Sequence, residues 1–302
     1  MIRNFNARET DMAENKLIRY TMIFMIIFSA TFYYGAYTLG VIAFFMMFMK
    51  EPRDIINSVS RERAIIFIAS ALLLSTVFSK VWFYSILIDM IIIIHLMVYL
   101  VIIKWIQNNG PEDLMKILNF LAIIISVYGI YQYFTGDLAI NTSWTDQDAY
   151  GVLVRVYSTM RNPNMFAAYL TFNICYAAAY FIRKGKDIYI AINIMLSSVC
   201  LILTYSRGGF IAFVAAMLVI TILCKKIKAG IYLLIMIILY YGYNSIESTG
   251  RTDLSTIAFD SSSLYRIEIW KAAWGLFKDN ITFGGGLGSI SQLLSFRSEK
   301  LK

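Results

Sequence analysis

The chain of 302 residues is 59% hydrophobic and only 15% charged, with a formal net charge of +8 at pH 7. A soluble domain of this length needs more polar surface, so the composition predicts a protein embedded in the lipid bilayer. The basic residues lie in short clusters between apolar runs, as in cytoplasmic loops, which argues against nucleic-acid binding. The three cysteines and the single His95 lie in or beside apolar runs, so we expect no disulfide framework, metal site or cofactor.

The first two apolar runs are too long for one span each, because a span needs about 20 residues. Residues 17–49 and 64–103 both lie between basic segments, and Lys and Arg mark the cytoplasmic side. Each run is therefore predicted to cross twice, with turns near residues 34–35 and 79–80. A single tilted helix in the first run would invert the topology, but the positive-inside bias favours two.

Five further spans are predicted along the rest of the chain. Residues 114–134 lead outward and residues 165–182 return. The run 188–224 has basic clusters at both ends, so it crosses twice and turns at the polar, glycine-rich residues 206–209. Residues 229–243 lead outward again. We thus expect an all-α, polytopic transmembrane helical bundle of about nine spans in the cytoplasmic membrane, with a cytoplasmic N-terminus.

This topology predicts two parts, a transmembrane helical domain at residues 1–243 and an extracytoplasmic segment at residues 244–302. Besides that tail, the loop 135–164 and the turn at Arg207 would lie outside the cell. Every arginine outside the cytoplasmic clusters falls in these three pieces. They are Arg155, Arg161, Arg207, Arg251, Arg266 and Arg297. We therefore expect the chemistry at the outer face of the membrane.

Arg207 is a functional candidate because of its position within a helical hairpin. An arginine there is costly unless it faces a cavity or a partner. The alternative is a snorkelling side chain that ends a helix at the outer headgroups. Position alone leaves both open.

A second candidate is the segment that precedes the span starting near residue 165. Pro163 fits a helix start, and Asn162 or Asn164 can cap exposed backbone N–H groups. Together with Arg155 and Arg161, those groups would form an anion site. Read in isolation, a capped helix with solvated arginines explains the same residues.

The tail contains a predicted amphipathic helix on the outer leaflet. One face would carry Leu264, Ile267, Trp270, Ala273, Trp274 and Phe277. Interfacial anchoring is the commoner role of such tryptophans, and stacking of Trp270 on a sugar is the alternative. The glycine-rich residues 284–288 are expected to form a flexible turn. In the fourth span, Asp89 and His95 are expected to serve helix packing rather than proton transfer.

Three pieces together resemble the O-antigen ligase and polymerase superfamily of bacterial envelope glycosyltransferases. They are Arg155 with residues 162–170, the segment 203–209, and Arg266 with Trp270 and residues 284–288. Their order, spacing and sidedness match the family pattern. The resemblance covers residues 120–289, and the first four spans agree only in layout.

The resemblance implies transfer or polymerisation of a glycan from an undecaprenyl-diphosphate donor to a glycan or lipid acceptor at the outer face. Arg155, Arg207 and Arg266 would be the catalytic residues that bind the diphosphate and stabilise its charge as it leaves. Arginine is suited to this, because it stays charged and grips phosphate in bidentate fashion without a metal. The implied substrate-binding residues are Arg161, Asn162, Asn164, Ser206 and Trp270.

One departure from the family concerns a histidine. Family members usually continue past the glycine turn to a His-Asn motif and further spans, and that histidine resembles a general base. This sequence ends at Lys302, and His95 lies in a predicted span. We expect a truncated gene product rather than a divergent enzyme with another base. Activity of this chain alone is therefore not expected.

A transporter or flippase for lipid-linked sugars is the alternative function. It would also have many spans and intramembrane arginines. Repeat-related halves and Gly- or Pro-broken spans would distinguish it, and the sequence shows neither. A membrane scaffold would not explain the gathering of arginines on one side.

Overall fold

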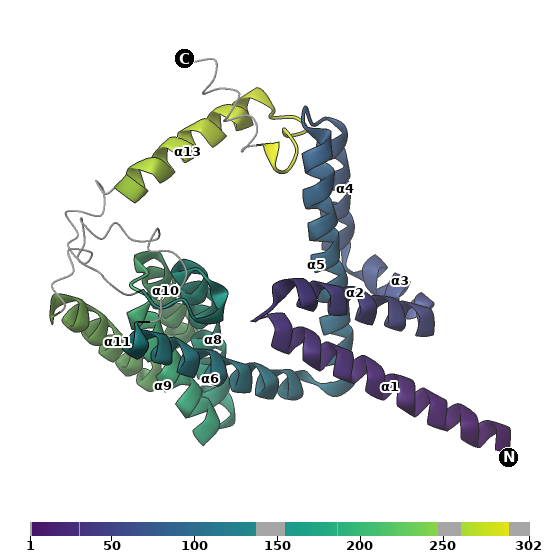
Figure 1. The fold of residues 1–302 in the computed structure, drawn as a ribbon, viewed down its shortest axis with the longest axis horizontal. Coiled ribbons are helices and arrows are strands. Elements are labelled where there is room, and N and C mark those ends of the chain that lie inside the picture. Colours follow the sequence, from purple (N-terminus) through teal and green to yellow (C-terminus); the bar gives the residue numbers. More distant parts are fainter. Residues whose placement is uncertain (1, 30, 137–154, 186, 247–260, 290–302) are drawn as a thin grey trace. The chain divides into compact units, whose positions relative to one another are not determined.

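The computed structural model describes residues 2–29, 31–136, 155–185, 187–246 and 261–289 (Figure 1). These residues form helices and turns and contain no strand, which confirms the all-α prediction for them. The chain divides into two compact units, residues 1–110 with 259–302, and residues 111–258. The predicted boundary after residue 243 separates membrane-spanning from extracytoplasmic residues, whereas these units are defined by contacts between helices. That boundary therefore stays a prediction.

The first unit contains six of the described helices. They are α1 (Ile2–Ser29), α2 (Tyr33–Lys50), α3 (Pro52–Arg61), α4 (Arg63–Val77), α5 (Trp82–Asn109) and α13 (Ser261–Asp279). Helices α1 and α2 pack against each other, and α2 also packs on α5 (Figure 1). Helix α4 ends at Val77 and α5 begins at Trp82, so the turn predicted at residues 79–80 is confirmed. The first turn was predicted at residues 34–35, but these residues lie in α2, which begins at Tyr33.

Two polar side chains predicted to serve helix packing do so in this unit. The Tyr37 hydroxyl on α2 is 2.9 Å from His95 Nε2 on α5, and the other ring nitrogen contacts the Ile91 carbonyl. The Thr76 hydroxyl on α4 donates to the Asp89 carboxylate on α5. Both contacts join neighbouring helices, as polar groups in lipid are expected to do.

Helix α3, a short helix between α2 and α4, was not predicted from the sequence. Its residues Ile55 and Ser58 are buried. Lys104 Nζ on α5 lies 2.5 Å from an Asp54 carboxylate oxygen and 3.5 Å from a Glu51 one. The hydrogen bond from this ammonium holds the pKa of the Asp54 carboxyl below its usual range. The ion pair therefore links the α3 region to the end of α5.

The glycine-rich segment after α13 is an anchored turn rather than the flexible one we expected. Ser79 Oγ donates to the Gly285 carbonyl and Ser85 Oγ to the Leu287 carbonyl, each at 3.0 Å. Gly286 has a φ of +85°, and any Cβ there would collide with both serine hydroxyls. The segment thus lies against the α4–α5 turn. This agrees with the predicted topology, which places both on one side of the membrane.

The second unit contains the remaining described elements. They are α6 (Pro111–Thr135), the short 3₁₀ helix η2 (Ser158–Met160), α8 (Pro163–Lys184), α9 (Ile188–Leu203), α10 (Arg207–Cys224) and α11 (Ile227–Ile246). Helix α9 packs on α6 and α8, and α10 packs on α8 and α11. The long apolar run 188–224 breaks at residues 204–206, next to the predicted turn.

Five helical segments in the described part are long and apolar enough to cross a membrane. They are Trp82–Asn108, Pro111–Thr135, Pro163–Arg183, Arg207–Cys224 and Ile227–Ser245. Three shorter apolar helices are Tyr34–Lys50, Arg63–Val77 and Ile188–Leu203. These segments support a multi-pass membrane protein. The count of nine spans and the cytoplasmic N-terminus stay predictions.

A buried polar network joins three helices of the second unit. Asn193 Nδ2 on α9 donates to Asn119 Oδ1 on α6 at 2.5 Å and to Asn173 Oδ1 on α8 at 3.1 Å. Asn173 Nδ2 donates in return to Asn193 Oδ1 and to Ser197 Oγ, both at 2.8 Å. All four side chains are buried. Hydrocarbon offers no water to such groups, so they bond to one another and hold the helices in register.

We expect Asn193→Leu to lower the free energy of unfolding by about 1–2 kcal/mol, because it removes the amide that bridges α6, α8 and α9. Ser245→Ala is the matched control, because Ser245 is exposed and its hydroxyl donates to its own helix, at the Tyr241 carbonyl. Reversible unfolding in mixed micelles measures both. Equal stabilities of Asn193→Leu and wild type would show that the network does not hold the helices together.

Candidate functional site

The candidate site lies where α8 and α10 begin, side by side. Ser206 precedes α10, and its hydroxyl donates to Asn164 Oδ1, in the first turn of α8, at 3.0 Å. The first backbone N–H groups of a helix have no partner within it, and the helix dipole makes that end positive. Two such ends together favour an anionic ligand.

Side-chain caps determine where these two helices start. Asn162 Oδ1 accepts from the N–H groups of Asn164 at 2.8 Å and Met165 at 3.3 Å, and Pro163 occupies the first helical position. Ser206 Oγ accepts from the Gly209 N–H at 3.3 Å. The sequence left open whether Asn162 or Asn164 caps α8. Asn162 does so, which leaves the Asn164 side chain available to contact its neighbours across the site.

Arg155, at the described end of the segment before η2, contacts this pair of helix starts. Its side chain is buried; Nε donates to the Thr204 carbonyl at 3.0 Å and Nη2 to Asn164 Oδ1 at 3.2 Å. The next residue, Val156, donates its N–H to the Leu203 carbonyl at 3.1 Å. These two bonds hold the guanidinium group beside the starts of α8 and α10.

Gly209 lets α8 and α10 approach closely. A Cβ at Gly209 would lie 2.5 Å from Ala167 Cβ, whereas a Cβ at Gly208 would meet nothing within 4 Å. The Thr171 hydroxyl on α8 also donates to the Gly209 carbonyl at 3.1 Å. The two neighbouring glycines thus differ, because Gly209 lies in the helix contact and Gly208 faces open space.

Strained backbone surrounds the site. Positive φ angles occur at Ser158 (51°), Arg161 (57°) and Tyr205 (50°), a conformation that costs residues with a side chain about 1–2 kcal/mol each. Gln132 on α6 holds Ser158, since Gln132 Oε1 accepts its N–H at 2.7 Å. The Tyr205 ring lies 5.9 Å from that of Tyr243 on α11. Such strain persists only where neighbouring contacts enforce it, and it is frequent at binding sites.

The structure brings some predicted site residues together. Arg155, Asn162, Asn164 and Ser206 form the connected group described above. Arg207 is the first residue of α10 and is half-buried, whereas Arg161 is exposed one residue before the α8 cap. In the described part of the chain, no three His, Cys, Asp or Glu side chains form a group that could hold a metal ion.

Arg266 and Trp270 lie on α13, in the other compact unit. Both are exposed, and Trp270 (69% exposed) shares its apolar surface with Trp274 and Phe277, whose rings stack 5.2 Å apart. An exposed aromatic face on a helix is typical of interfacial anchoring. The gathering of Arg155, Arg207 and Arg266 at one diphosphate stays a prediction.

Several residues that shape the site were not predicted from the sequence. The Thr204 carbonyl accepts a hydrogen bond from Arg155, and the Gln132 side chain accepts one from the Ser158 N–H. The Tyr243 ring contacts the ring of Tyr205. Thr204 lies within the motif at residues 203–209 but was given no role, and no motif spacing distinguishes Gln132 or Tyr243 from other polar residues near helix ends. The small-residue pair Gly208–Gly209 was a detectable signal for close helix approach, but it was interpreted only as a turn.

The fold and the site define a multi-pass helical membrane protein with a buried arginine at two adjoining helix starts. Residues 192–300 match the family model for O-antigen ligase. For residues 192–300, this match confirms the resemblance of the motifs to the O-antigen ligase and polymerase superfamily. The matched range includes Arg207 and Arg266, whereas Arg155 lies before it. No curated protein and no solved structure matches the chain.

Proposed function

We propose that this protein is a membrane glycosyltransferase that transfers or polymerises a glycan from an undecaprenyl-diphosphate donor at the outer face of the cytoplasmic membrane. The observation that supports this most is the contact of Arg155 and Ser206 with one acceptor, Asn164 Oδ1, at the adjoining starts of α8 and α10. It combines a fixed cation with two positive helix ends. A diphosphate is the ligand chemistry that such a site fits.

The reaction needs this positive charge most in its transition state. An acceptor hydroxyl oxygen forms a bond to the anomeric carbon of the donor glycan, while the bond from that carbon to the diphosphate oxygen breaks. The electron pair of the broken bond stays on the diphosphate, whose charge grows in the transition state. Donors fixed in advance, such as Arg155, stabilise that charge without reorganising. The hydroxyl proton passes to a base outside the described group of site residues.

The remaining predicted residues have proposed roles around this centre. Arg207 would place its planar guanidinium on the diphosphate from the first turn of α10. Arg161, exposed beside the α8 cap, would hold an outer phosphate oxygen. Trp270 would stack on a sugar of the donor or anchor α13 at the headgroups.

The sidedness of the site gives a separate prediction. In a cysteine-free background, Lys80→Cys, Thr145→Cys and Ser261→Cys should react with a membrane-impermeant thiol reagent in intact cells. Lys184→Cys and Lys226→Cys should react only after the membrane is opened, because basic clusters stay in the cytoplasm. The opposite labelling pattern would show that the topology is inverted and that the proposed site lies at the cytoplasmic face.

Transfer itself is tested with a form of the protein that includes the His-Asn part expected from the family, in proteoliposomes that contain an undecaprenyl-diphosphate glycan and an acceptor. We expect the glycan to appear on the acceptor and undecaprenyl diphosphate to be released. The transporter alternative predicts instead that the intact lipid-linked glycan changes leaflet without cleavage. That outcome would refute the glycosyltransferase proposal.

A further inference from the structure

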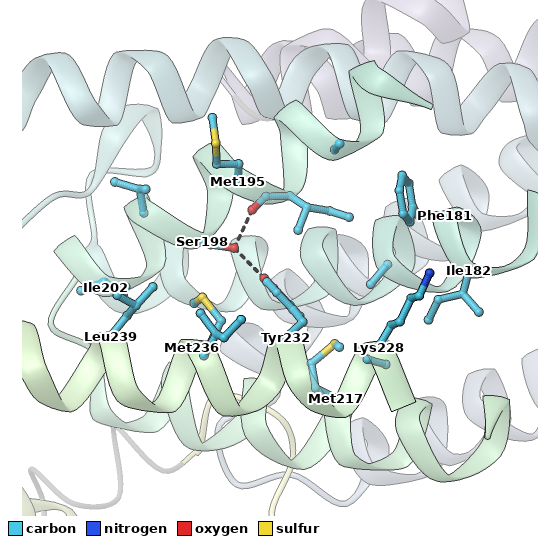
Figure 2. Close-up of a pocket in the computed structure, with 16 residues that line it drawn as sticks. Phe181, Ile182, Met195, Ser198, Ile202, Met217, Lys228, Tyr232, Met236 and Leu239 are labelled. Carbon is cyan, nitrogen blue, oxygen red and sulfur yellow. Dashed lines mark hydrogen bonds between the residues drawn. The ribbon is translucent and has the colours of Figure 1, made fainter. Parts of the chain in front are cut away.

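The second unit also contains an apolar groove that the proposed reaction does not use. Its volume is about 410 Å³, within the usual range for small-molecule sites, and it lies among α8, α9, α10 and α11 (Figure 2). Phe181 and Ile182 contribute from α8, Met195 and Ile202 from α9, and Met236 from α11. Walls of this kind suit a hydrocarbon chain.

The two hydroxyls in the middle of the groove already bond to protein. Ser198 Oγ lies 2.6 Å from the Tyr232 hydroxyl and donates to the Ile194 carbonyl at 2.5 Å (Figure 2). A sugar or another polar ligand at this level would have to break these bonds. The middle of the groove therefore favours an apolar occupant.

A cation lies at one end of this groove. Lys228, in the first turn of α11, lines it, and Figure 2 shows the side chain extending toward Ile182. Lys225 and Lys226 are exposed just before Lys228. An ammonium at the end of an apolar channel matches an amphiphile with an anionic head and an apolar tail.

The length of the groove fits a lipid of a single leaflet. Lys228 and Leu239 both line it on α11, and a helix of that length rises by about 17 Å. Half of the hydrocarbon thickness of a bilayer is about 15 Å. A chain whose headgroup lies at Lys228 would thus extend to about the bilayer midplane.

We propose that the groove is a binding site for an anionic phospholipid, with one acyl chain among α8, α9 and α11 and the phosphate at Lys228. In the predicted topology this lipid comes from the cytoplasmic leaflet. A polyprenyl chain is the rival occupant, but its diphosphate would be at the Arg155 end and would leave Lys228 without a role. The site stands independently of the proposed glycosyl transfer.

The test titrates phosphatidylglycerol and phosphatidylcholine into the delipidated full-length protein and measures binding by native mass spectrometry. Wild type should bind phosphatidylglycerol more tightly than phosphatidylcholine. Lys228→Gln should weaken phosphatidylglycerol binding about fivefold, the effect typical of one basic residue near an anionic lipid. Lys226→Gln removes the same charge outside the groove lining and should have a much smaller effect.

A second variant tests the apolar part. Ala191→Leu adds bulk to the groove wall and should weaken binding of phosphatidylglycerol without a change of charge. The proposal is overturned if the two lipids bind equally well to wild type, or if Lys228→Gln and Lys226→Gln have equal effects. Displacement of phosphatidylglycerol by undecaprenol at equal concentration would assign the groove to a polyprenyl chain and also overturn the proposal.

Discussion

Gly209→Ala is expected to abolish most glycan transfer, whereas Gly208→Ala should leave it near the wild-type rate. A methyl group at Gly209 would come 2.5 Å from Ala167 Cβ, so α10 must move away from α8. Cores and helix contacts accommodate such overlaps poorly, at a typical cost of about 1–3 kcal/mol. That movement would separate Ser206 from Asn164 and disrupt the site. Transfer in proteoliposomes at matched protein levels measures the effect.

A compensating substitution makes this prediction specific. Ala167→Gly removes the methyl group that Gly209→Ala would meet, so the double variant should regain most of the lost transfer. Gly208→Ala controls for the added bulk and reduced flexibility of alanine, because nothing lies within 4 Å of its Cβ. Equal losses in Gly208→Ala and Gly209→Ala, with no recovery in the double variant, would contradict the close helix contact as the reason.

Arg207→Lys and Arg207→Ala should both lose about 10²–10³ in the transfer rate, the usual effect of removing one donor that stabilises a developing anion. The diphosphate gains charge as the glycosidic bond breaks, so a fixed guanidinium stabilises the transition state more than the ground state. Lysine keeps the charge but lacks the planar fork, which is why it should rescue little. The rate of glycan release from the undecaprenyl-linked donor reports the loss.

Arg183→Ala provides the matched control for that experiment. Arg183 is exposed at the end of α8 opposite the site, and its removal takes away one positive charge without touching the helix starts. It should transfer glycan at the wild-type rate. If Arg207→Ala also does so, Arg207 only ends a helix at the headgroups, and its catalytic role is wrong.

Charge parity predicted the helix breaks well because it depends on a strong physical term. Basic clusters at both ends of residues 188–224 predicted two crossings with a turn between them, and the helices do break at residues 204–206. The same logic located the break at residues 78–81, and it placed the first turn a few residues too late, within α2. Predicting these breaks required no knowledge of side-chain contacts. Charge parity could not predict α3, because a short amphipathic helix between two spans leaves no trace in the charge pattern.

Contacts between distant segments could not be predicted. Gly285 and Ser79 are far apart in sequence, so nothing local showed that the glycine-rich turn is anchored by the α4–α5 turn. The network of Asn119, Asn173 and Asn193 could not be predicted for the same reason. The position of a single polar residue in an apolar run does not show which residue it contacts. Such pairings depend on how the helices pack.

The candidate site was predictable in residue type but not in geometry. The motifs indicated arginines, asparagines and a serine beside helix starts, and these residue types suit an anion. They did not show that Asn162 is the cap and that Asn164 instead accepts from both Arg155 and Ser206. These different contacts of Asn162 and Asn164 require α8 and α10 to begin side by side. Local sequence does not determine the spatial relation of two helices separated by a third.

The most direct test of the central claim is whether the site recognises a diphosphate. Purified full-length protein in nanodiscs of neutral lipid is titrated with undecaprenyl diphosphate and, separately, with undecaprenol. Because charge-assisted hydrogen bonds to the diphosphate are strong, we expect it to bind at least about tenfold more tightly, with inorganic pyrophosphate as a competitor. Equal affinity for the two lipids, with no competition by pyrophosphate, would contradict a diphosphate site at the starts of α8 and α10.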